Sequence, residues 1–157
     1  MQVYCGGDKI LQRSDVPQWN LLNNSKGPFQ PSQSQIDNEL FPKGTNIYMI
    51  QGKTYTLSAK TNGTFTDTHD NLYESNLCTI WLTSNPDMTG DYAIISDRNT
   101  TTGTTFIWEK PTGDYCVRVN SYRKDNSIKI WDIKIEEGNV ATGWLPAIAD
   151  LMLKSQE

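Results

Sequence analysis

Side chains capable of covalent chemistry are few and scattered in this chain. The one histidine, His69, lies in a stretch rich in Thr and Asp, so a Ser-His-Asp or Cys-His arrangement would have to use it. No nucleophile-elbow motif, Gly-rich phosphate loop or zinc-ligand spacing is present. Glu136 and Glu137 could form a carboxylate pair for glycoside hydrolysis, but they adjoin a turn, where we expect them to be solvated. The sequence therefore favours binding over catalysis and predicts that the protein is not an enzyme.

Two segments carry side chains that suit a saccharide. Sugars present flat apolar C–H faces edged by hydroxyls, which an aromatic ring and planar polar groups can hold together. Residues 77–83 and 115–122 each alternate apolar positions with such groups. The predicted ligand-binding residues are Trp81, Arg118, Asn120 and Tyr122. If the two segments are neighbouring strands with these faces aligned, the four would line a solvent-open concave surface. The alternative is that Trp81 packs in a core or under a loop, as most tryptophans do.

The elements that must position these residues are predicted to be short strands. Thr, Asn, Ser and Gly make up a third of the 157 residues, and they favour turns and strand surfaces over helices. Residues 54–61 alternate well, with Tyr55, Leu57 and Ala59 on one side. Together the segments predict an all-β fold, an antiparallel β-sandwich of several short strands. Periodicity alone leaves jelly-roll and immunoglobulin-like topologies open.

Charge and cysteine content limit which partners and which disulfide bonds we expect. The net charge is −4 and the pI is near 5.0, which argues against a nucleic-acid partner. No apolar run approaches the roughly 20 residues that span a bilayer, and no signal peptide opens the chain, so we expect no membrane partner. The three cysteines, Cys5, Cys78 and Cys116, are too few and too irregular for a disulfide framework. A single Cys78–Cys116 bridge stays possible if their strands are neighbours.

Residues 127–147, SIKIWDIKIEEGNVATGWLPA, organise the chain. The β-branched and aromatic run predicts a buried strand, the EEGN that follows predicts a turn, and Trp144 suits a segment that folds back on the sheet. This stretch resembles the last strand and exit of the jelly-roll carbohydrate-binding modules carried on tail and baseplate proteins of phages of Gram-positive bacteria. WNLLNNSKGPFQP, from Trp19, is similar to the first strand of the same family.

The resemblance implies a jelly-roll topology and a lectin-like function. It divides the chain into a leader or linker (1–18), a carbohydrate-binding-like module (19–147) and a C-terminal tail or linker (148–157). The function it implies is non-catalytic adhesion, in which a virion protein made in the host cytoplasm binds cell-wall or surface polysaccharide of a Gram-positive host alongside other tail or baseplate proteins. The alternative is an architectural virion domain that only mediates protein–protein assembly.

The resemblance also implies a structural calcium ion, and we expect that no other cofactor is required. Asp132 stands where the final strand of the family often carries an acid that helps to bind Ca²⁺, and loop carbonyls could complete the oxygen ligands. Residues 23–27, on the side of the first strand, contain no acidic partner. The alternative is that Asp132 caps a turn or faces solvent.

Overall fold

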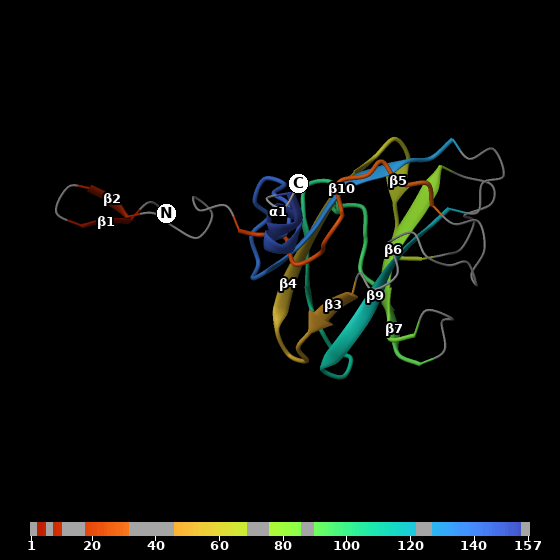
Figure 1. Cartoon of the computed structure of the whole chain (residues 1–157), viewed down its shortest axis with the longest axis horizontal. Helices are drawn as coiled ribbons and strands as arrows, with labels where there is room; N and C mark the ends of the chain where they lie inside the picture. The colour runs from red at the N-terminus through yellow and green to blue at the C-terminus, as the bar shows by residue number, and fades with distance from the viewer. Residues whose placement is uncertain are drawn as a thin grey trace.

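The described residues form an all-β sandwich, as the sequence predicted, and a short helix follows it (Figure 1). This computed structural model describes residues 3–5, 8–10, 18–31, 46–68, 76–85, 90–121 and 127–154. His69 and Tyr122 lie outside the described residues.

The larger sheet has five strands. Its order is β3 (Asn46–Met49), β9 (Gly113–Asn120), β6 (Leu77–Thr83) and β5 (Thr64–Phe65), and β7 (Tyr92–Ile94) also pairs with β6. Only β5 runs parallel to its neighbour β6, and the other pairings in this sheet are antiparallel.

The smaller sheet has the order β10 (Ile130–Glu137), β4 (Thr54–Thr61) and β8 (Thr104–Ile107), all antiparallel. It therefore ends at β8 on one side. The helix α1 (Ile148–Lys154) follows β10. Near the N-terminus β1 (Val3–Cys5) and β2 (Asp8–Ile10) pair with each other in a separate two-stranded sheet.

The core lies between the two sheets because the strands alternate as predicted. In β4 the inward positions are Tyr55, Leu57 and Ala59, all at most 3% exposed. Facing them are side chains from the larger sheet, among them Ile47, Met49, Cys78, Ile80, Leu82, Tyr115, Val117 and Val119. Full burial of each large aliphatic side chain contributes about 1.5–3 kcal/mol, so this layer is the main stabilising feature of the sandwich.

Residues 20–30 run along the free side of β10. The Asn20 side chain substitutes for a strand partner, because its Nδ2 donates to Ile133 O (2.7 Å) and its Oδ1 accepts from Ile135 N (3.0 Å). Further along, Phe29 forms an antiparallel bridge with Ile130. The segment that resembles a first strand is thus held by β10 without itself being a regular strand.

The residues after β10 are held by a buried ion pair. Lys134 Nζ lies 3.3 Å from Glu136 Oε2, and both side chains are fully buried. Thr142 Oγ1 accepts from Lys134 Nζ (2.6 Å) and donates to Glu136 Oε2 (2.8 Å), while Gly143 O accepts a second Lys134 bond (2.9 Å). Burial lowers the pKa of Lys134, and the charge of Glu136 opposes this shift. The prediction that Glu136 is solvated was therefore wrong, whereas Glu137 is exposed and pairs with Lys53.

Cys78 and Cys116 are free thiols on opposite faces of the larger sheet. Cys78 points into the core, whereas Cys116 is in register with Thr83 on the other face and is half-buried. Although Cys78 and Cys116 lie on neighbouring strands, they cannot form the disulfide that the sequence left open, because their side chains point to opposite faces of the sheet.

Among the described residues no helix is long and apolar enough to cross a membrane.

Candidate functional site

The four residues predicted to bind a saccharide are only partly placed as expected. Trp81 of β6 is in register with Arg118 of β9, and Thr79 of β6 with Asn120, so the predicted alignment of the two strand faces is confirmed. The predicted exposure is wrong, because Trp81 and Arg118 are each 2% exposed and Asn120 is 0% exposed. Tyr122, the fourth, is outside the described residues.

The reason is that these side chains pack against one another. The indole Nε1 of Trp81 donates to Asn120 Oδ1 at 2.5 Å. The Arg118 guanidinium carbon lies 5.5 Å from the centre of the Trp81 ring, and Tyr92 meets that ring edge-on at 6.0 Å. The group on the outer face of the larger sheet is therefore a packed layer, and a sugar has no access to the Trp81 ring in this conformation.

Asp132 does not fit the calcium site that the resemblance implies. It adopts a positive φ of 52° at the β10 bulge, which turns its carboxylate toward two ammonium groups. Lys26 Nζ lies 2.6 Å from Oδ1 and Lys60 Nζ lies 2.9 Å from Oδ2. Burial opposes ionisation, but the hydrogen bonds and charges of both lysines outweigh it and lower the pKa of Asp132.

Two ammonium groups would repel a divalent cation, and they already neutralise the one carboxylate. No group of three or more His, Cys, Asp or Glu side chains that could hold a metal ion occurs in the described part of the chain. The expectation that Asp132 faces solvent is wrong as well, since only 7% of the residue is exposed.

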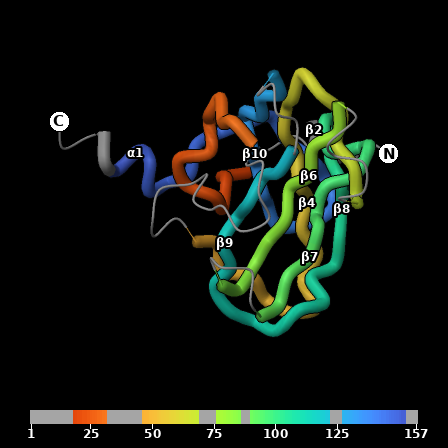
Figure 2. The backbone as a smooth tube through the Cα atoms, turned by 90° about the vertical axis from the view of Figure 1, so that its right-hand side faces the viewer, coloured from red at the N-terminus to blue at the C-terminus, as the bar shows by residue number. Residues whose placement is uncertain are grey.

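An open cleft lies instead where the two sheets end. On this side the larger sheet finishes with β7 and the smaller sheet with β8, and Figure 2 shows these two strands at the same side of the sandwich. Between them is a cleft of about 340 Å³. The residues that line it come from Asp67 and from the two runs 93–97 and 104–110, all of them described.

The middle of the cleft is apolar. Ala93 of β7 and Phe106 of β8, both partly exposed, pack against the core and line the cleft from its two strands. Phe106 stacks on the buried ring of Tyr55, with centroids 6.1 Å apart, and this contact holds the Phe106 ring in place. Trp108 closes the cleft at depth, since it is 1% exposed and packs edge-on against Tyr115 at 4.7 Å. The cleft therefore has firm apolar walls.

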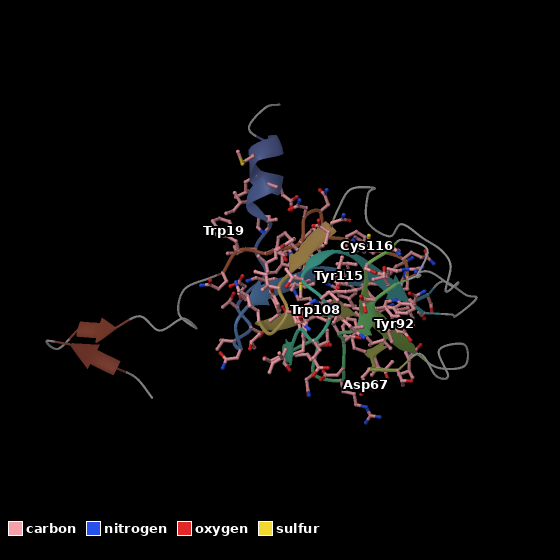
Figure 3. The ribbon with its side chains drawn as sticks, turned by 90° about the horizontal axis from the view of Figure 1, so that it is seen from below. Trp19, Asp67, Tyr92, Trp108, Tyr115 and Cys116 are labelled. Carbon is pink, nitrogen blue, oxygen red and sulfur yellow. The ribbon has the colours of Figure 1, made fainter. Side chains whose placement is uncertain are left out.

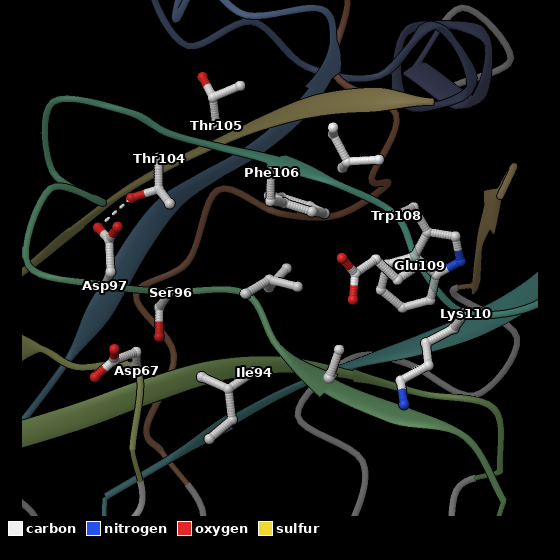
Figure 4. Close-up of a pocket in the computed structure, with 13 residues that line it drawn as sticks. Asp67, Ile94, Ser96, Asp97, Thr104, Thr105, Phe106, Trp108, Glu109 and Lys110 are labelled. Atoms are coloured by element: carbon white, nitrogen blue, oxygen red, sulfur yellow. Dashed lines mark hydrogen bonds between the residues drawn. The ribbon is translucent and has the colours of Figure 1, made fainter. Parts of the chain in front are cut away.

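Polar side chains lie at both ends of the cleft. Figure 4 places Asp67, Ser96 and Asp97 at one end and Glu109 and Lys110 at the other. Figure 3 shows Asp67 at the edge of the sandwich, away from Trp19 and α1. A ligand lying across the apolar middle would meet hydrogen-bonding groups at each end.

The turn beside Asp97 fixes one of these ends. Asp97 Oδ1 accepts a hydrogen bond from Asn99 N (2.6 Å) and a short one from Thr104 Oγ1. The backbone N of Asp97 donates to Thr100 Oγ1 at 2.8 Å. This network holds the chain between β7 and β8 and presets the width of the cleft at that end, so little ordering would accompany binding.

Sequence reasoning missed this cleft. The predicted ligand-binding residues Trp81, Arg118 and Asn120 do not line it. Asp67 and Asp97 follow strand ends in turn-rich stretches, which was the available signal, but nothing in their spacing shows that they meet at one edge.

Comparison of the chain with protein-family models, with curated proteins and with solved structures gave no match.

Proposed function

We propose that this chain is a non-catalytic saccharide-binding domain with the jelly-roll topology. In this proposal it belongs to a phage tail or baseplate protein and binds a cell-surface polysaccharide of a Gram-positive host. The stretch 127–147 supports the family, through its resemblance to the exits of such modules. The observation that carries the function is the cleft between β7 and β8, with its apolar middle and polar ends.

This pattern matches the chemistry of a sugar. A pyranose ring has an apolar face that could lie against Ala93 and Phe106, and the release of water from these surfaces favours contact. Its hydroxyls extend to the sides, where carboxylates accept hydrogen bonds and Lys110 donates them. The buried layer around Trp81 has a supporting role in this proposal, since it stiffens the strand on which β7 rests.

The cleft is small, so one site would bind weakly. A volume of about 340 Å³ is near the lower end for ligand pockets and accommodates only a short stretch of polysaccharide. Several copies on one tail would compensate, because after the first contact the remaining sites bind at a high effective concentration.

Calorimetry on the full chain with purified host wall polysaccharides tests the proposal. Phe106 lines the cleft and is in register with the inward-facing Tyr55, so its side chain lies on the cleft side of β8. We expect Phe106→Ser to weaken binding about 5- to 30-fold, because the apolar contact it would lose is worth about 1–2 kcal/mol. The matched control is Tyr48→Ser, which removes a side chain 58% exposed on β3, another edge strand, and should leave affinity unchanged.

Two results would contradict the proposal. If no host polysaccharide binds, the chain is not a saccharide-binding domain. If reducing sugar is released from purified wall, the non-catalytic assignment is wrong.

One observation favours the architectural alternative. Trp19 is 47% exposed, and α1 exposes Ile148, Leu151 and Met152 at helical spacing. Such apolar side chains suit contact with another protein. Under this alternative, replacing Leu151 with Glu would change assembly with tail proteins, while Phe106→Ser would leave that assembly unchanged.

A further inference from the structure

The cleft between β7 and β8 carries an uneven distribution of charge. Three carboxylates, Asp67, Asp97 and Glu109, line it together with one ammonium group, that of Lys110. Lys110 shares its end with Glu109, so those two charges offset each other locally (Figure 4). The excess of negative charge is therefore concentrated at the end formed by Asp67 and Asp97.

The two carboxylates at that end differ in how they are engaged. Asp97 is tied into the turn through Asn99 and Thr104. Asp67 is exposed and lies just beyond β5, where Ser96 directs its hydroxyl away to Thr66 O (2.8 Å). Asp67 can therefore turn its carboxylate to a ligand without breaking the turn.

Resting on the saccharide-binding function above, we propose that this cleft selects saccharides that carry a protonated amine, with the amine held at the Asp67 end. A sugar ring across Ala93 and Phe106 would place a ring substituent at the end of the cleft. A carboxylate there forms a charge-assisted hydrogen bond with an ammonium group, and it repels phosphate or carboxylate substituents. The ligand class is thus an amino sugar without N-acetylation, as opposed to a neutral or anionic glycan.

Oligomers of glucosamine and of N-acetylglucosamine, matched in length, test this by calorimetry on the full chain. We expect the amine-bearing oligomer to bind about tenfold more tightly, and we expect added salt to reduce this preference. Asp67→Asn keeps the side-chain shape but removes the charge, so the preference should fall to about one while binding of the N-acetylated oligomer is unchanged. The control is Asp114→Asn, which removes an exposed carboxylate outside the cleft and should preserve the preference.

The outcomes separate the two proposals. Equal affinity for both oligomers would overturn the amine selectivity and leave the saccharide-binding function standing. A preference that survives Asp67→Asn would overturn the placement of the amine. If neither these oligomers nor any wall polysaccharide binds, the proposed function itself fails.

Discussion

Replacing Lys134 with methionine is expected to lower the free energy of unfolding by about 3–5 kcal/mol, the range for breaking one side of a buried ion pair. The structure supports the full range because the Lys134 and Glu136 side chains are both 0% exposed. Methionine fills much of the same space but cannot donate to Thr142 Oγ1 or Gly143 O, which lie 2.6 and 2.9 Å from Nζ. The Glu136 carboxylate would remain buried without its counter-ion, which is the larger part of the cost.

Urea unfolding gives this free energy, and the thermal midpoint gives a second reading. For a chain of 157 residues, a loss of 3–5 kcal/mol corresponds to a fall of about 6–20 °C in Tm. The matched control is Lys53→Met, which breaks a pair of similar length, 2.9 Å to Glu137, whose side chains are about half exposed. Because surface pairs contribute at most about 1 kcal/mol, this variant should unfold nearly as the parent does.

A second substitution isolates the charge. Glu136→Gln keeps an oxygen acceptor for Thr142 N, which donates to Glu136 Oε1 at 2.9 Å, but removes the uncompensated charge. The double variant with Lys134→Met should therefore recover part of the stability that Lys134→Met alone loses. The reasoning is refuted if Lys134→Met lowers the free energy of unfolding no more than Lys53→Met does. It is also refuted if the double variant loses the sum of what Lys134→Met and Glu136→Gln lose separately.

Three further predictions follow from buried groups. Trp81→Ala should lower stability by about 3–5 kcal/mol in urea unfolding, because it removes a large side chain that is 2% exposed; a variant as stable as the parent would show that Trp81 is not packed. The pKa of Asp132 is lower in the folded protein than in the unfolded chain, so at acid pH the unfolded chain binds more protons. The stabilisation that Asp132 contributes is therefore complete above its unfolded pKa of 3.8 and is lost as the pH falls through its folded pKa. Asp132→Asn should reduce the fall in the free energy of unfolding with decreasing pH, measured from pH 6 to pH 2. Burial raises the pKa of Cys78 to about 12, so iodoacetamide should modify half-buried Cys116 well before Cys78 in the native protein, as peptide mass mapping would reveal, and faster labelling of Cys78 would contradict its burial.

Much of the fold was predictable because strand alternation is a local property. The positions of Tyr55, Leu57 and Ala59 in β4 identify their inward face without any knowledge of the partner strand. The same reasoning placed Trp81 and Arg118 on one face, and the register of β6 with β9 confirms it. A period of two was sufficient in both cases.

Exposure was not predictable in the same way. Alternation tells which side of a strand a residue takes, but it does not tell what covers that side. Trp81 and Glu136 both lie out of phase with core residues, and both are buried with polar partners. Trp81 donates to Asn120 on the neighbouring strand, and Glu136 pairs with Lys134 and Thr142. The cleft could not be predicted for a related reason, since Asp67 and Glu109 line the same cleft only when the two sheets have packed on each other.

The stretch 127–147 shows why a resemblance can carry a fold more securely than a ligand. Two of its charged residues, Lys134 and Glu136, hold Thr142 and the chain that follows β10, so their spacing is set by closure of the sandwich. The residues that line the cleft come from other parts of the chain. Under the proposed function, sequences could share this stretch and still bind different sugars, because substitutions at Asp67 or Phe106 would change the cleft and leave the buried ion pair intact. Transferring 127–147 between two sandwiches that share this stretch should preserve folding without transferring specificity, whereas transferring specificity should require both Asp67 and the segment 93–110.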